Sequence, residues 1–164
     1  MKYKFKILLL GLLLVSGFHF SSFAQFSSSE IKNLTNGADI ILTGKVTDQA
    51  SSWNENKTRI YTKATIQVNE YIKGNSTGGT VTVNYPGGEI GEIGEMYSHM
   101  PRFEDNEEVL VFLKKSRNNT DYKVLNGAEG KINLLNDEVT GEKITSSRVP
   151  LNSLKEQISN YLNE

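Results

Sequence analysis

The chain has 164 residues, of which 37% are hydrophobic and 23% charged, as in a single soluble globular domain. Residues 1–24 hold three lysines and no acidic residue, so 15 basic residues face 19 acidic ones in the rest of the chain, a net charge of −4. A mildly acidic chain lacks the basic face that binds nucleic-acid phosphates. The absence of cysteine excludes disulfides, thiolate metal sites and a cysteine nucleophile.

Residues 1–24 have the three parts of a secretory signal: a basic start, an apolar stretch over residues 7–15, and the small residues Ser22 and Ala24 at positions −3 and −1 for cleavage before Gln25. The apolar stretch is shorter than the roughly 20 residues that span a bilayer, which favours cleavage over an uncleaved anchor. We therefore expect residues 25–164 to be one exported domain, periplasmic or secreted, with no stable membrane insertion.

A short helix is predicted at the start of the mature chain. Ser27 and Glu30 have the spacing of a capping box, and Gly37 is a stop signal. Ile31 and Leu34 lie one turn apart between these signals, so they form the face that this helix would bury.

Alternating hydrophobic and polar residues, separated by turn signals, predict a mainly β domain behind this helix. Residues 51–57 are polar and are expected to form a turn around Trp53. The run at 59–72 is long for one strand, which predicts a bend or bulge. Residues 109–113 are apolar on both faces, as in a central strand. The expected strands are 38–47, 59–72, 80–85, 109–113, 122–125, 131–135 and 142–145.

Two apolar stripes predict buried faces. One face of the run at 59–72 carries Ile60, Ala64, Ile66, Val68 and Ile72. Near the C-terminus, Ser153 and Glu156 repeat the capping-box spacing and predict the start of a second helix. The stripe of that helix consists of Leu151, Leu154, Ile158 and Leu162.

The strongly uneven strand lengths favour a small, bent barrel over a regular immunoglobulin-like sandwich. We predict a mainly β fold, an OB-like barrel of five or six strands. The N-terminal helix should pack on it through Ile31 and Leu34, and the C-terminal helix through Leu154 and Ile158.

His99 is the only histidine after the predicted signal. A site in which two or three histidines bind zinc is therefore excluded within one chain, and no Gly-x-Ser-x-Gly motif is present. No metal and no cofactor are predicted. His99 lies in residues 96–101, which we expect to be an exposed loop.

Two acidic segments leave alternatives open. Residues 88–95 are expected to form a loop or a bulged edge strand, although a curled loop would direct Glu89, Glu92 and Glu95 onto a hard cation such as Ca²⁺. The acidic run of Glu104, Asp105, Glu107 and Glu108 is expected to be solvated, although paired carboxylates also serve glycoside hydrolysis. Trp53, the sole tryptophan, is interpreted as a plug at the barrel end or as a ligand platform.

Several short motifs together resemble an uncharacterised group of exported bacterial domains, which occur alone or ahead of matrixin-like metalloprotease regions. The resemblance spans about residues 38–135, and its most specific blocks are residues 86–88 and 108–113. It rests on Gly44-Lys-Val46, Ser51-Ser-Trp53, Ile60-Tyr-Thr62, Val68, Ile72-Lys-Gly74, Val81-Thr-Val83, Pro86-Gly-Gly88, Pro101-Arg-Phe103, Glu108-Val-Leu-Val-Phe-Leu113 and Gly130-Lys131.

A weaker resemblance reaches the netrin-like and TIMP-like domains through Ala38-Asp-Ile40, Gly44-Lys-Val46 and Lys73-Gly74. This resemblance implies the same OB-like five-stranded barrel. The inhibitors of that family chelate a protease zinc through an N-terminal cysteine held by disulfides. Because this chain has no cysteine, the resemblance does not extend to that mechanism.

The most distinctive residues fall in predicted loops, where binding sites are commonly carried on a rigid scaffold. We therefore predict a non-enzymatic binding module that contacts a protein partner, and not nucleic acid, through barrel-end loops. We further expect the Trp53 ring to pack near the turn at residues 86–89. The candidate binding residues are Trp53, Gly87, Gly88, Glu89, His99, Arg102 and Phe103.

The alternative function is a carboxylate-dependent hydrolase. It would use Glu89, Glu92, Asp105 or Glu107 together with His99. This alternative requires that two of the carboxylates and the histidine converge in one pocket.

Overall fold

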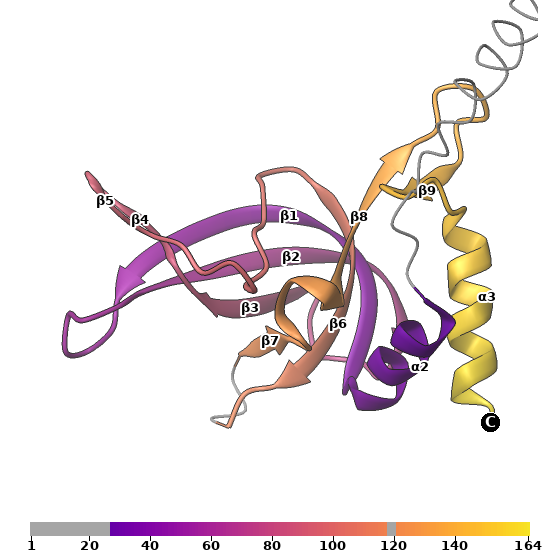
Figure 1. Ribbon diagram of the computed structural model, residues 1–164, viewed down its shortest axis with the longest axis horizontal. Coiled ribbons are helices and arrows are strands. Elements are labelled where there is room, and N and C mark those ends of the chain that lie inside the picture. Colours follow the sequence, from indigo (N-terminus) through magenta and orange to yellow (C-terminus); the bar gives the residue numbers. More distant parts are fainter. Residues whose placement is uncertain (1–26, 118–120) are drawn as a thin grey trace, which may run out of the picture.

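The computed structural model describes residues 27–117 and 121–164 (Figure 1). The predicted export signal lies outside the described residues. The elements, in chain order, are α2 (Ser28–Gly37), β1 (Ile40–Trp53), β2 (Ile60–Lys73), β3 (Thr80–Pro86), β4 (Gly88–Ile90), β5 (Ile93–Glu95), β6 (Glu108–Lys115), β7 (Tyr122–Val124), the 3-10 helix η1 (Gly127–Gly130), β8 (Lys131–Asn136), β9 (Lys143–Thr145) and α3 (Leu151–Leu162).

Five strands close into a barrel in the order β1-β2-β3-β7-β6, and β6 pairs back onto β1. All neighbours are antiparallel except β3 and β7, which pair in parallel at Val83 and Tyr122. β8 and β9 continue the sheet beyond β6. This topology confirms the predicted mainly β, OB-like barrel, with one helix before it and one after it in the chain.

β1 is longer than predicted. Residues 51–53 were expected in a turn, but they belong to β1, and Trp53 pairs with Ile60 at the start of β2. The turn begins at Asn54, whose side-chain oxygen accepts hydrogen bonds from the backbone amides of Thr58 and Arg59. The polar residues of this segment are therefore exposed strand residues, which polarity alone does not distinguish from a turn.

The predicted irregularity in the long second strand is confirmed. The register between β1 and β2 shifts at three places, two of which leave Asn69 and Ile72 of β2 without a partner. A bulge reverses the direction of the side chains beyond it. Tyr71 consequently packs inside the barrel, and Ile72 packs outside it against the helices, so the prediction that Ile72 shares a face with Ile60 was wrong.

The structure has two hydrophobic cores, which share β1 and β6. On β6, Val109, Val111 and Leu113 fill the barrel, while Leu110 and Phe112 point to the opposite core. This confirms the central strand expected at 109–113. The outer core consists of Ile31, Leu34, Ala38, Ile41, Leu110, Phe112, Ile132, Leu134, Leu154 and Ile158.

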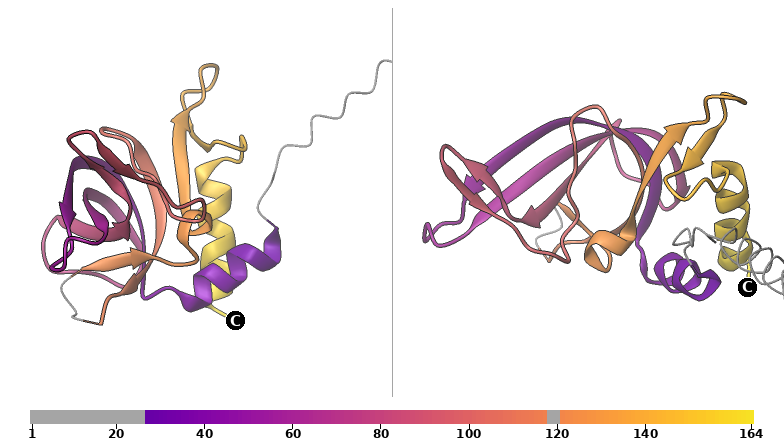
Figure 2. Two further views of the ribbon diagram at one scale, coloured as in Figure 1. Left: turned by 60° about the vertical axis from the view of Figure 1, so that its left-hand side comes forward. Right: turned by 45° about the horizontal axis from the view of Figure 1, so that its top comes forward.

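The two helices lie together on one side of the barrel (Figure 2). α2 has the predicted capping box: the Glu30 amide donates to the Ser27 hydroxyl at 3.2 Å, and the Glu30 carboxylate accepts from the Ser27 amide at 2.7 Å. The capping box predicted for the second helix was wrong. α3 begins earlier, at Leu151 directly after Pro150, whose fixed φ is compatible with a helix start.

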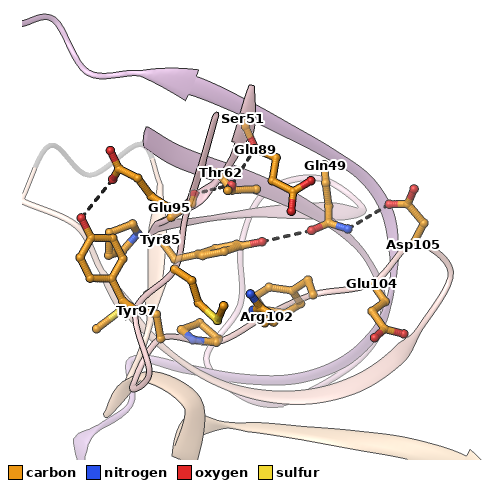
Figure 3. A pocket seen from close by; sticks show the side chains of 18 residues that line it. Gln49, Ser51, Thr62, Tyr85, Glu89, Glu95, Tyr97, Arg102, Glu104 and Asp105 are labelled. Carbon is orange, nitrogen blue, oxygen red and sulfur yellow. Dashed lines mark hydrogen bonds between the residues drawn. The ribbon is translucent and has the colours of Figure 1, made fainter. Parts of the chain in front are cut away.

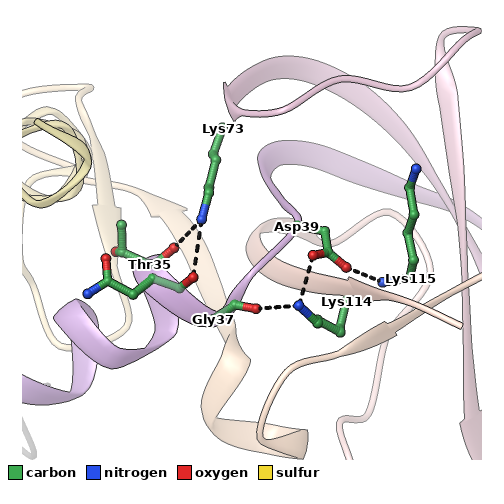
Figure 4. Close-up of polar contacts among 7 residues, drawn as sticks. Thr35, Gly37, Asp39, Lys73, Lys114 and Lys115 are labelled. Atoms are coloured by element: carbon green, nitrogen blue, oxygen red, sulfur yellow. Dashed lines mark hydrogen bonds and ion pairs between the residues drawn. The ribbon is translucent and has the colours of Figure 1, made fainter.

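An aspartate fixes the end of α2 to the barrel (Figure 4). The Asp39 carboxylate accepts hydrogen bonds from the Lys114 ammonium at 2.8 Å and from the Lys115 amide at 2.9 Å. Lys114 also donates to the carbonyl of Gly37, and Lys73 donates to that of Thr35. The Lys114 hydrogen bond, followed by that of the Lys115 amide, holds the pKa of Asp39 below its ordinary value of 3.8.

Removing a buried side chain from α3 should destabilise the whole domain. Ile158 is fully buried in the outer core, so Ile158→Ala is expected to lower the free energy of unfolding by about 3 kcal/mol. Leu162 of the same helix is 38% exposed, and Leu162→Ala should cost less than about 1 kcal/mol. Urea denaturation measures both values, and equal losses would contradict the packing of α3 on the barrel.

Asp39→Asn should destabilise the protein in a pH-dependent way. A lowered pKa in the folded state stabilises the fold above pH 3.8, and that stabilisation disappears as the pH falls through the folded value. We expect a loss of about 1 kcal/mol at pH 7, after allowance for solvent screening, and a vanishing difference from the parent chain near pH 2. Denaturation from pH 7 to pH 2 measures this difference.

The control for this experiment is Asp48→Asn. The Asp48 side chain is exposed and makes no hydrogen bond or ion pair with a described residue, so its replacement should change little at either pH. A pH-independent loss for Asp39→Asn would show that its charge does not matter.

Candidate functional site

A cavity of about 580 Å³ lies beside the β4–β5 hairpin (Figure 3). This hairpin extends from the barrel end away from the helices (Figure 1). The β4–β5 hairpin forms one wall and residues 96–105 form the other. Strand residues form the floor. The lining residues are Gln49, Ser51, Thr62, Tyr85, Pro86, Gly87, Gly88, Glu89, Gly94, Glu95, Met96, Tyr97, Met100, Pro101, Arg102, Phe103, Glu104 and Asp105.

Residues 88–95 form a separate two-stranded hairpin, β4–β5, rather than a loop or an edge of the main sheet. The chain leaves β3 through Gly87 and Gly88, which have φ values of +103° and +130°. A Cβ atom on Gly88 would lie closer than 3.0 Å to the hydroxyls of Thr62 and Ser51. Glycine is thus required both for the backbone turn and for the close approach of the hairpin to β1 and β2.

The hairpin separates the three carboxylates that recur in it. Glu89 and Glu95 line the cavity, whereas Glu92 is exposed near the turn and does not. The three carboxylates therefore do not converge on one point, as the binding of a calcium ion by this segment would require. Over residues 27–117 and 121–164, no group of three or more histidine or acidic side chains is placed to hold a metal ion.

A chain of hydrogen bonds crosses the floor of the cavity (Figure 3). The Tyr85 hydroxyl donates to the Gln49 side-chain oxygen at 3.1 Å, and the Gln49 side-chain nitrogen donates to Asp105 at 3.1 Å. The Tyr85 ring packs against Phe103 with 5.6 Å between ring centroids. Burial raises the pKa of the Tyr85 hydroxyl, so this group stays a hydrogen-bond donor at neutral pH.

Glu95 ties the hairpin to the barrel. Its carboxylate accepts hydrogen bonds from the backbone amide of Ile60 at 3.2 Å and from the Tyr97 hydroxyl at 3.0 Å. The guanidinium of Arg59 lies 5.8 Å from the centroid of the Tyr97 ring. These contacts fix the position of the wall from which Met96 and the hairpin extend.

Charged groups around the cavity are left without partners. The Arg102 guanidinium and the carboxylates of Glu89 and Glu104 make no hydrogen bond or ion pair with any described residue.

The last two residues of the acidic run differ from Glu104. Glu107 and Glu108 were expected to be solvated, but they form ion pairs of 2.7 Å with Lys131 and Lys143.

Five of the seven candidate binding residues line the cavity: Gly87, Gly88, Glu89, Arg102 and Phe103. The other two, Trp53 and His99, do not. His99 is exposed, with its ring 2.9 Å from the Ser98 hydroxyl, and its backbone carbonyl accepts from Ala128.

Trp53 is half-buried at the end of β1, opposite Ile60, whose carbonyl accepts a hydrogen bond from Gly87. The side chains that lie against Gly88 are Ser51 and Thr62. The predicted contact of the Trp53 ring with residues 86–89 stays a prediction.

Only two of the residues expected to act in a hydrolase lie together in the structure. Glu89 and Asp105 line the same cavity, but Glu92, Glu107 and His99 do not. Glu107 is instead buried against Lys131. The hydroxyls of Ser51 and Thr62 bond to each other at 2.9 Å, and Thr62 also donates to the carbonyl of Gly87.

Sequence reasoning missed Gln49, Tyr85, Met96 and Tyr97. Gln49 was missed because the first strand was expected to end at residue 47, where a bulge at Thr47 interrupts the alternation. In the sequence, Tyr85 has the pattern of an ordinary strand residue. Its alternation with Val83 placed it inside the barrel, but nothing local indicated that the barrel opens at this end.

No protein-family model matches this chain, and no match is found among curated proteins. The family resemblance drawn from the sequence motifs therefore stays a prediction. In the described part of the chain, no helix combines the length and the apolar character needed to cross a membrane.

Replacing Gly88 should damage the cavity wall. Gly88→Ala is expected to lower the free energy of unfolding by about 1–3 kcal/mol more than Gly78→Ala, because only the former places a Cβ atom against other atoms. Gly78 also has a large positive φ, +101°, but has open space around it, so it controls for backbone strain. Thermal and urea denaturation measure the difference, and two equal losses would contradict the close approach of the hairpin.

Proposed function

We propose that this protein is an exported, non-enzymatic binding module that holds a protein partner at the barrel-end cavity. The observation that carries this proposal is the cavity itself, whose volume of about 580 Å³ is within the usual range of ligand sites. It is carried by a closed barrel and is bordered by segments 88–95 and 96–105. Such an arrangement, connecting segments on a rigid scaffold, is typical of binding sites.

The rim of the cavity supports a protein partner. Met96, which lines the cavity, is 70% exposed, so a large apolar side chain faces solvent at the opening. Methionine is common on surfaces that bind proteins, because its flexible side chain adapts to different partners. A polar cavity with an apolar rim offers both orientation and buried area to an inserted segment.

The lining of the cavity supports binding over catalysis. It contains no histidine, and the hydroxyls of Ser51 and Thr62 are hydrogen-bonded to each other and to a backbone carbonyl rather than to a base. A hydrolase acting through Glu89 and Asp105 is the alternative. Hydrolysis of a glycoside by the purified protein, lost in Glu89→Gln, would favour that alternative.

Site-specific photo-crosslinking tests the proposed function in the cells that make the protein. A photo-reactive amino acid replaces Met96 at the cavity rim in one variant and Val139 in another. Val139 is 93% exposed and lies on the β8–β9 hairpin, away from the cavity. It therefore controls for indiscriminate contacts of an exposed apolar side chain.

The expected result is a protein adduct of defined mass from position 96 and none of that mass from position 139. A third position, Arg102 across the cavity, should give the same adduct. Adducts of equal yield at all positions, or none at position 96 or 102, would contradict the proposed function.

A further inference from the structure

We propose that the cavity takes a basic segment of the partner, with a lysine or arginine side chain inserted between the β4–β5 hairpin and residues 96–105. This inference rests on the proposed function and adds the chemistry of the partner. It is carried by the charge of the cavity, by the aromatic side chains in its wall and by its apolar rim.

The cavity is acidic and its acidity is not neutralised within the chain. Four carboxylates line it, those of Glu89, Glu95, Glu104 and Asp105, against the single guanidinium of Arg102. In the described part of the chain, lysines neutralise six other carboxylates through ion pairs of 4.0 Å or less, but no cavity carboxylate is among them. An entering cation would meet a net negative field, because four carboxylates and one guanidinium line the cavity.

Two aromatic rings of the cavity wall already attract cations. The Arg59 guanidinium lies 5.8 Å from the centroid of Tyr97, and the Lys131 ammonium lies 5.0 Å from that of Phe103. Both cations belong to this chain, so the wall combines aromatic rings and carboxylates in the way that cation sites do. A partner's lysine or arginine would find the same surroundings from inside the cavity.

The rim suits a long basic side chain rather than a bare ion. Exposed Met96 would cover the aliphatic stem of lysine or arginine, while the charged end reaches Glu89 or Glu104. An acidic segment would gain only Arg102 and would be repelled by the four carboxylates. A metal ion is disfavoured because the carboxylates do not converge on one point among the described residues.

A library of random heptapeptides displayed on phage tests the inference with the purified, immobilised protein. Selection is run in parallel on the parent chain and on the double variant Glu89→Gln, Glu104→Gln. Both carboxylates are exposed and have no partner in the described structure, so the double variant should keep the parent melting temperature, which is measured.

The expected result is enrichment of lysine and arginine on the parent chain and loss of that enrichment on the double variant. Enrichment of acidic or neutral peptides, or basic peptides that the double variant retains, overturns the inference and leaves the proposed function standing. No enrichment at all also overturns the inference, and crosslinking at position 96 then decides whether the proposed function falls with it.

The affinity of the most strongly selected peptide tests whether the charge of the cavity, rather than its shape, determines binding. Fluorescence anisotropy should show binding about tenfold weaker for the double variant, as for the loss of a charged contact in a partly enclosed site. Arg102→Gln removes the one cation that lines the cavity, and it should strengthen binding. Binding abolished by Arg102→Gln would identify an anionic occupant and would overturn the inference.

Discussion

The structure depends on one strand that serves two neighbours. The first half of β1, residues 40–45, pairs with β6 on one edge and with β2 on the other, and this double pairing closes the barrel. Beyond Val46, whose backbone still bonds to residues 106 and 107, β1 continues with β2 alone, as far as Trp53. The barrel is therefore closed at the helix end and widens at the other end, where the long β1–β2 pair carries the floor and one side of the cavity.

Close approach between β1 and β2 makes this geometry possible. A Cβ atom on Gly44 would lie within 3.0 Å of the backbone of Gln67, so only glycine allows the two strands to cross as tightly as they do. Three register shifts then redistribute the side chains of the pair between the two cores. β6 has apolar side chains on both faces because one core lies on each side of it.

The cavity follows from the same constraint. Gln49 reaches both Tyr85 and Asp105 because β1 extends past the barrel, and the β4–β5 hairpin lies beside β1 and β2 because Gly88 has no side chain. The carboxylates at the rim remain unpaired, while those at the barrel side, such as Glu107, are matched with lysines. The carboxylates of Glu89 and Glu104 thus face the cavity without a contact to any other described residue.

The sequence by itself determined the order of the helices and strands, the capping box of α2, the central strand at 109–113 and the barrel class, because hydrophobic periodicity and turn residues act over a few neighbours along the chain. It also predicted one surface that joins Trp53, residues 87–95 and residues 99–103, of which Trp53 and His99 do not line the cavity. Only the tertiary structure decided where the first strand ends, which face Ile72 takes and which carboxylates remain unpaired. These outcomes depend on bulges and on contacts between residues far apart in the chain, and no local pattern records them.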